Sequence, residues 1–160
     1  TKILANKELF EKGVSKAEID EYERKLWILK ALSFVHKEGD KNVLDKAGFE
    51  TFLKRLNAAK IDKSGYIEMT STMEVYFMLS DWNAYVNNAI LYMKKYKGKA
   101  SPMLTWNWGA RLEGACKDKE LRLKYVEELE PNYNLIKKTD TEQAIIWADG
   151  MKSLFAKLKN

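Results

Sequence analysis

The residues from Asp81 to Asn132 constrain the fold of this chain more than any other stretch. They include three of the five tryptophans, the only cysteine and both prolines. Asp81 and the Ser101-Pro102 pair are helix start signals, because a capping side chain accepts a bond from a free backbone N–H and proline fits the first helical position. Read with a helical period, the stretch predicts one helix, a turn at Lys97–Ser101, a second helix, and a third helix that ends at Pro131.

The flanking residues predict more helices of the same kind. Ser15-Lys16-Ala17-Glu18 matches a capping box, and the apolar spacing after it predicts a helix that ends near Gly39. No alternating apolar run bounded by hairpin dipeptides indicates a strand. Further helices are expected over 2–11, from about 42 to 59, from about 66 to 80, and from about 139 to the C-terminus.

The spacing of these helices predicts a stacked array. Helix pairs are expected to begin near Tyr66, Pro102 and Thr139, about 36 residues apart, which is close to the ~34 residues of a tetratricopeptide helix pair. One such pair cannot bury its own apolar face, so neighbouring pairs must stack. The expected fold is all-α: antiparallel helix pairs in a right-handed tetratricopeptide-like array of about seven to eight helices.

Length and composition limit the other possibilities. At 160 residues, one domain over 1–160 is expected, and its start at Thr1 indicates a processed chain or a piece of a longer one. The net charge of +5 is interspersed with acidic residues, and the one dense basic run, Lys94–Lys99, fits a helix C-terminus better than a phosphate site. No apolar run approaches the ~20 residues that span a bilayer. A single cysteine excludes an internal disulfide and leaves the redox compartment open.

One segment resembles a known repeat. Val126–Tyr133, with the sequence Val-Glu-Glu-Leu-Glu-Pro-Asn-Tyr, resembles the closing motif of a tetratricopeptide repeat, in which an acidic-proline step ends the second helix of a pair. Where that pattern has small residues, this chain has Asn107, Lys119 and Val126. The resemblance implies helix pairs but not a regular superhelix.

A longer resemblance covers about residues 15 to 150. The segment Tyr85–Tyr96, the following Leu104–Leu112 with its Asn/Trp pair, and the charged helix that ends in Pro-Asn-Tyr resemble the helical region after the thioredoxin domain in thioredoxin-family proteins of Bacteroidetes. That family's redox chemistry needs a Cys-x-x-Cys pair, which this chain lacks, so no catalytic residue is transferred. The resemblance implies an accessory region whose partner is an adjacent domain, with a periplasmic or cell-envelope location.

A calcium loop is the first candidate for chemistry. Within Ile61–Glu68, Asp62 and Ser64 take oxygen-ligand positions when Gly65 is aligned with the invariant glycine of such loops. The first ligand position then falls on a lysine and the bidentate glutamate position on Ser71. An ordinary connecting turn is therefore favoured.

The single histidine and the single cysteine are further candidates. His36 is expected near a helix end on the surface, without the orienting partner that acid–base catalysis needs. Cys116 is expected to be a small buried residue at a helix end, although neighbouring lysines would lower its pKa. One histidine and one cysteine do not supply the about four ligands of a zinc site. No catalytic residue, metal ligand or cofactor is assigned.

The aromatic residues give the one candidate binding surface. Large rings at helical spacing mostly fill a core, which is the expectation for Trp82, Trp106 and Trp147. Trp106 and Trp108 point ~200° apart on a helix, so one of them should pack between helix pairs or line an exposed groove. An exposed tryptophan next to Asn107 and Arg111 would anchor a partner peptide. The candidate groove residues are Trp106, Asn107, Trp108, Arg111, Tyr85 and Tyr92.

Three functions remain open from the sequence. The first is a non-enzymatic helical scaffold that binds a protein or peptide, or supports an adjacent domain such as a thioredoxin-like one. The second is an enzyme that brings carboxylates together from distant helices in a closed pocket. The third is a weak nucleic-acid binder that uses the basic excess, and its affinity would depend steeply on salt.

Overall fold

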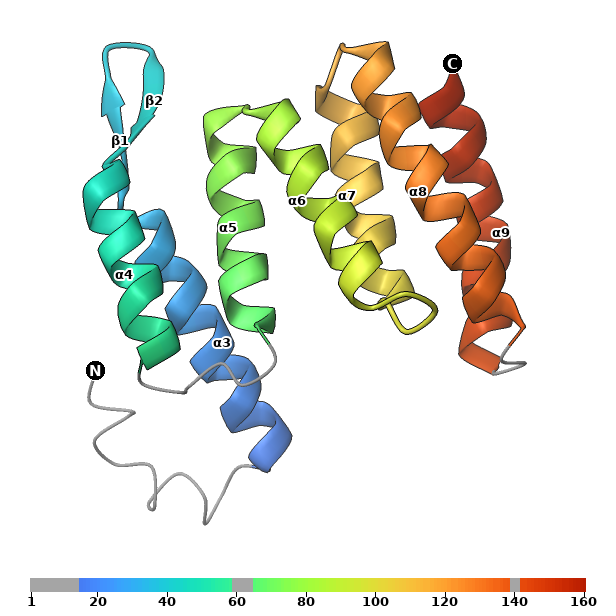
Figure 1. Cartoon of the computed structure of the whole chain (residues 1–160), viewed down its shortest axis with the longest axis horizontal. Coiled ribbons are helices and arrows are strands. Elements are labelled where there is room, and N and C mark those ends of the chain that lie inside the picture. The colour runs from blue at the N-terminus through green and yellow to red at the C-terminus, as the bar shows by residue number, and fades with distance from the viewer. Residues whose placement is uncertain (1–14, 59–64, 139–141) are drawn as a thin grey trace. The chain divides into compact units, whose positions relative to one another are not determined.

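Helices dominate the fold. A computed structural model describes residues 15–58, 65–138 and 142–160, and in these ranges it holds seven helices and one two-stranded hairpin (Figure 1). This confirms the all-α prediction. In chain order the elements are α3 Lys16–Leu32, β1 Val35–Glu38, β2 Lys41–Leu44, α4 Lys46–Ala58, α5 Tyr66–Leu79, α6 Trp82–Lys95, α7 Pro102–Ala115, α8 Lys119–Lys137 and α9 Glu142–Lys159.

The contacts divide the chain into two compact units, Thr1–Val75 and Tyr76–Asn160, with the boundary inside α5. Each unit is described by itself, and the expectation of a single domain over the whole chain stays a prediction. The helix expected over 2–11, the calcium-like residues Asp62 and Ser64, and the helix start near Thr139 lie outside the described residues.

The first unit begins as expected and then departs from the prediction. The Ser15 hydroxyl accepts from the Glu18 N–H, and the Glu18 carboxylate accepts from the Ser15 N–H at 2.9 Å, so the capping box is confirmed. However, α3 ends at Leu32 rather than near Gly39. The next helix, α4, begins at Lys46 rather than near Asn42.

A short hairpin occupies the residues between these two helices. Strands β1 and β2 pair antiparallel, with His36 opposite Val43, and the loop is Gly39-Asp40. Gly39 has φ +61°, which glycine adopts at little cost and a two-residue hairpin loop requires at its first position. The expectations of no strand and of a helix end at His36 were therefore wrong. The strands have only four residues each, and half of these residues are exposed, so the sequence shows no alternation of apolar and polar residues long enough to indicate a strand.

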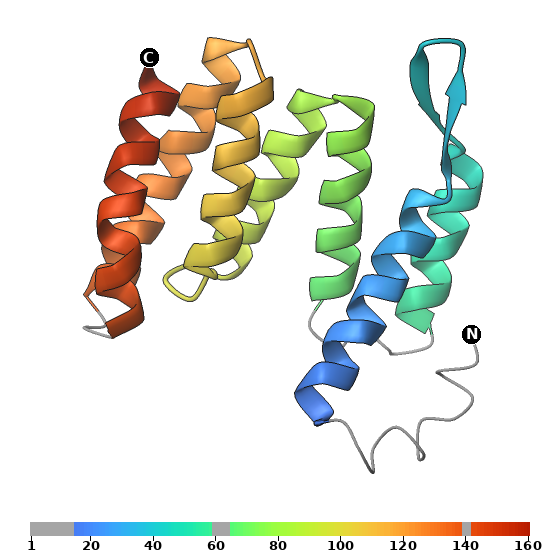
Figure 2. The same ribbon diagram turned by 180° about the vertical axis from the view of Figure 1, so that it is seen from behind.

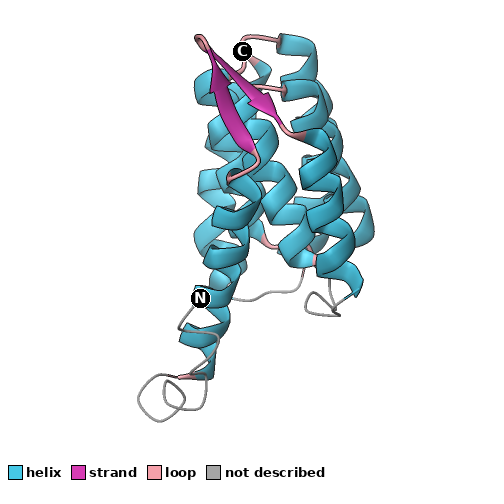
Figure 3. Ribbon diagram, turned by 90° about the vertical axis from the view of Figure 1, so that its left-hand side faces the viewer, coloured by secondary structure: helices cyan, strands magenta, loops and turns pink. Residues whose placement is uncertain are grey.

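Aromatic rings form the core of the first unit. Phe34, just before β1, lies 5.6 Å from Phe52 and 6.2 Å from Phe49 between ring centroids, and Trp27 of α3 lies 6.0 Å from Phe52. Ring pairs at these distances attract beyond their area burial. The hairpin projects past the ends of α3 and α4 (Figures 1 and 3), so this cluster holds the two helices together below it.

The second unit contains α6 to α9 as two layers. Helices α6 and α8 pack together in one layer, and α7 and α9 pack together in the other (Figures 1 and 2). The predicted caps are confirmed, because Asp81 accepts from the Ala84 N–H at 3.0 Å and Ser101 from the Leu104 N–H at 3.4 Å. Pro102 occupies the start of α7, as expected.

The expected end of α8 was wrong. Pro131 lies inside the helix, which continues to Lys137. Proline removes one helical hydrogen bond there, but Asn132 and Tyr133 directly after it are buried, so packing holds the helix past it. The acidic-proline step therefore does not close a helix as it does in the tetratricopeptide motif.

Candidate functional site

Three of the six predicted groove residues lie in the core of the second unit. Tyr85 donates its hydroxyl to the Trp108 carbonyl at 3.3 Å, and the Tyr92 hydroxyl accepts from the Ser101 N–H at 3.1 Å. The rings of Tyr92 and Trp108 meet edge to face at 5.1 Å, and Trp108 is only 3 % exposed. In this conformation none of the three can contact a partner.

The other three predicted residues face different neighbours. Trp106 is half-buried, and its Nε1 lies 3.5 Å from where a side chain on Gly150 of α9 would begin. Asn107 is exposed, whereas the Arg111 guanidinium lies 4.7 Å from the centre of the Phe77 ring. Trp106 and Trp108 thus face different sides of α7, and the six residues do not line one groove. Their role in binding stays a prediction.

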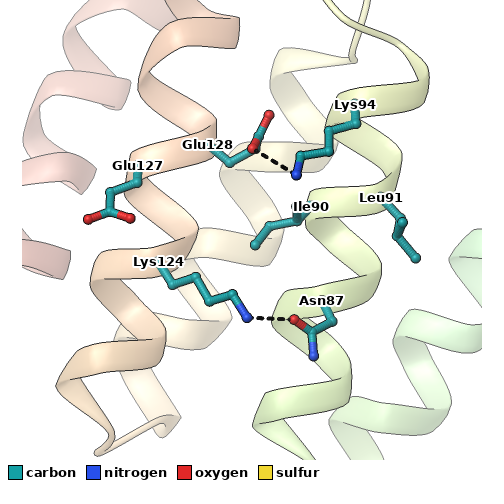
Figure 4. Close-up of a pocket in the computed structure, with 7 residues that line it drawn as sticks. All are labelled: Asn87, Ile90, Leu91, Lys94, Lys124, Glu127 and Glu128. Carbon is teal, nitrogen blue, oxygen red and sulfur yellow. Dashed lines mark hydrogen bonds and ion pairs between the residues drawn. The ribbon is translucent and has the colours of Figure 1, made fainter.

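A groove between α6 and α8 is the candidate site of the second unit. It has a volume of about 480 Å³, within the usual range of ligand sites. Ile90 fills its floor between the two helices, and Leu91 lies on the flank of α6 that faces away from α8 (Figure 4). The residues that line it are Asn87, Ile90, Leu91 and Lys94 of α6, and Lys124, Glu127 and Glu128 of α8.

Two polar bridges cross this groove. Lys124 donates to the Asn87 side-chain oxygen at 2.8 Å, and Lys94 lies 3.7 Å from Glu128 (Figure 4). On each helix the two bridging residues are one helical turn or more apart, so the helical period places both of them on the side that faces the other helix. Such an exposed ion pair contributes only about 0–1 kcal/mol, and a partner can displace it at little cost.

The flanks of the groove are the parts that remain available to a partner. Leu91 is 61 % exposed, so its apolar side chain is accessible to a partner. Glu127 is exposed and makes no ion pair with any residue in the described ranges. The outer edges of the groove therefore carry a leucine and a carboxylate, each of which points away from the space between α6 and α8 (Figure 4).

The single histidine and the single cysteine are not part of this groove. His36 is exposed on β1, with its Nε2 3.1 Å from Glu38 Oε1. Cys116 is buried at the end of α7, as predicted, and its Sγ lies 3.7 Å from the Asp118 carbonyl. Burial raises the pKa of the Cys116 thiol, so the lowering expected from the neighbouring lysines was wrong.

The described carboxylates do not gather at one place. Hydrogen bonds from Ser15 lower the pKa of Glu18, and a hydrogen bond from Arg24 lowers the pKa of Glu21. Both shifts arise on the surface of α3 from residues on or next to the same helix. Within the described ranges, no group of three or more His, Cys, Asp and Glu side chains could hold a metal ion.

Sequence reasoning missed the groove, although its residues recur at helical spacing. Asn87 and Lys94 belong to one helix and Lys124 and Glu128 to another, and only the packing of α6 on α8 brings them together.

Comparison with protein-family models, curated proteins and solved structures finds no match to this chain. Among its described helices, none is both long and apolar enough to cross a membrane.

Proposed function

We propose that this chain is a helical scaffold that binds a protein or peptide segment across the groove between α6 and α8, in contact with both of its outer edges. The observation that carries this proposal is the exposed Leu91 beside a groove that two displaceable polar bridges cross. Burying one leucine side chain gains about 1.5–3 kcal/mol, which is enough for an anchor contact. Glu127 on the opposite flank favours a segment that also carries a lysine or arginine.

The arrangement of the second unit supports the scaffold over the enzyme alternative. An enzyme that uses carboxylates would bring them together where water is excluded and their pKa values change. In the groove, Glu128 is close to Lys94, whereas Glu127 points away from α6 (Figure 4). This groove is open and its carboxylates diverge, which suits binding of an extended segment.

The finer architecture and the partner are part of the same proposal. We infer a tetratricopeptide-like arrangement, supported by the packing of α6 on α8 and of α7 on α9, because stacked helix pairs place each helix against the one two further along the chain. The resemblance to the helical region of thioredoxin-family proteins makes an adjacent thioredoxin-like domain the first partner to consider. A periplasmic or cell-envelope location follows from the same resemblance.

Peptide selection tests the site. A random peptide library is selected on the full chain, with counter-selection against the Leu91→Asp variant, and the affinity of the selected peptides is measured by fluorescence anisotropy. We expect Leu91→Asp to weaken binding by about tenfold or more, because the apolar anchor is lost. Leu29→Asp is the matched control, since Leu29 of α3 is 62 % exposed and lies outside the groove.

Equal binding to wild-type and Leu91→Asp protein would contradict the proposed site. A purified thioredoxin domain, titrated as competitor, should displace the selected peptide if this domain is the partner. Failure to compete would remove that partner and leave the groove itself in place.

A further inference from the structure

We propose that the first unit holds a second docking surface, a groove between α3 and α4 that binds an acidic peptide segment. One apolar side chain of the peptide would lie on the floor of the groove, and the peptide's carboxylates would lie beside the cations on its rim. This inference goes beyond the proposed function, because it concerns other residues in the other unit. The groove has a volume of about 550 Å³, and its lining residues are Lys30, Phe34, Asp45, Ala47, Gly48, Thr51, Phe52 and Arg55.

The floor of this groove is aromatic and fixed. Phe34 and Phe52 belong to the ring cluster of the core, with centroids 5.6 Å apart. Phe34 is half-buried, so part of its ring is accessible from the groove. A rigid apolar floor of this size suits one large aliphatic or aromatic side chain of a partner.

The wall at the start of α4 is built closely around a glycine. The Gly48 N–H donates to the Asp45 carboxylate at 2.9 Å, and the Asp45 N–H donates to the Phe34 carbonyl at 2.8 Å. A methyl group on Gly48 would lie 2.8 Å from the Phe34 ring and would clash with the Asp45 carboxylate. The space beside Gly48 is therefore already filled by Phe34 and Asp45.

The one carboxylate of the groove is already engaged. Asp45 faces the start of α4, where the free N–H groups and the helix dipole favour a negative charge. Its charge is offset by the helix, so it does not neutralise the cations on the rim.

Two cations, Lys30 and Arg55, line the rim of the groove. Lys30 lies 5.3 Å from the centre of the Phe34 ring, and Arg55 is exposed on α4. Neither forms an ion pair with a carboxylate of the described residues. The ring contact holds the Lys30 ammonium at the mouth of the apolar floor.

Charge complementarity therefore selects the occupant. An apolar side chain on the floor places neighbouring aspartate or glutamate side chains beside Lys30 and Arg55, and guanidinium binds carboxylates well. Two cations beside an aspartate form no continuous basic stripe, which argues against nucleic acid as the occupant.

The experiment selects peptides on the full chain with counter-selection against a Lys30→Gln, Arg55→Gln double variant. We expect the selected peptides to combine acidic residues with one large apolar residue, and the double variant to weaken their binding by about tenfold or more. A Lys97→Gln, Lys99→Gln double variant is the matched control, since it removes two exposed charges in the other unit. The charge-reversed Lys30→Glu, Arg55→Glu variant should prefer basic peptides instead.

Three results would overturn the proposal: no peptide that prefers the wild-type chain, selected peptides without acidic enrichment, or equal loss in the Lys97→Gln, Lys99→Gln control. Thr51→Trp gives a second test of the site. Thr51 is exposed, and a large side chain there fills the groove while both cations remain. Unchanged affinity in Thr51→Trp would contradict the site. The Leu91→Asp variant tests the other groove, so failure of either proposal can be told apart.

Discussion

The two units of this protein stabilise their interiors in different ways. In the first unit, Phe34, Phe49, Phe52 and Trp27 fill the space between two helices with rings, and the close contacts there are between rings. In the second unit, buried polar groups bond to backbone across the helices, as the Tyr85 hydroxyl does to the Trp108 carbonyl. The stability of the first interior therefore depends on how well the rings fill its space, and that of the second also depends on satisfied hydrogen bonds.

The largest effect should follow from emptying the ring cluster. Phe52 is buried and touches three other rings, so Phe52→Ala removes contacts and leaves a cavity. We expect a loss of about 3–5 kcal/mol in the free energy of unfolding. Denaturation followed by circular dichroism measures it, and Thr51→Ala on the exposed side of α4 is the control. A loss below about 1 kcal/mol would show that the rings do not act as one core.

The polar interior of the second unit is tested by Asn132. Its side-chain oxygen accepts from the Gly98 N–H at 3.2 Å, and its amide donates to the Glu128 carbonyl at 3.0 Å. Asn132→Ala leaves the Gly98 N–H in the turn after α6 without its partner, at a cost of about 1–3 kcal/mol.

Hydrogen exchange at Gly98 and urea denaturation measure this cost. Asn134→Ala is the matched control, because Asn134 is exposed on the same helix. If both alanine variants unfold at the same urea concentration, Asn132 is not a structural link between the Gly98 turn and α8.

How well the sequence predicted the structure also differs between the units. In the second unit the local signals agreed with the packing: Asp81 and Ser101 cap the helices that they were expected to cap. The exception is Pro131, where burial of the next two residues outweighs the local preference for a helix end.

In the first unit a local signal was overlooked. Gly39-Asp40 is a hairpin dipeptide, but His36 and Lys37 before it are exposed polar residues. The same residues are therefore also compatible with the exposed end of a helix. The two grooves could not be predicted from the sequence for another reason. Lys30 and Arg55 are far apart in sequence, and only the docking of α3 on α4 places them on one rim.

The third prediction concerns the hairpin turn. Gly39 has φ +61° with no atom near enough to obstruct a methyl group, so Gly39→Ala costs backbone strain alone. We expect a loss of about 1–2 kcal/mol, confined to the first unit. Gly39→Asn should recover most of it, because asparagine tolerates this conformation. Equal stability of the alanine and asparagine variants, by thermal denaturation, would contradict the positive φ.

The smallest expected effect, and the sharpest test of the polar interior, is at Tyr125. This side chain is fully buried, its hydroxyl donates to the Thr105 carbonyl, and its ring lies against the space kept free by Gly109. Tyr125→Phe keeps the ring and removes one hydrogen bond, so we expect a loss of about 0.5–1.5 kcal/mol at neutral pH.

The pH dependence separates this hydroxyl from simple packing. Burial raises the pKa of Tyr125 well above 10.0, so the folded chain keeps the phenol proton after the unfolded chain has begun to lose it. The stability that this group contributes is complete below about pH 10 and declines as the pH rises further. Wild-type protein should therefore lose stability above that pH more steeply than Tyr125→Phe, and the gap between them should narrow. Parallel curves in urea denaturation across this pH range would show that the buried hydroxyl is not linked to folding, and the contrast between the two units would then rest on Asn132 and the Tyr85 hydroxyl.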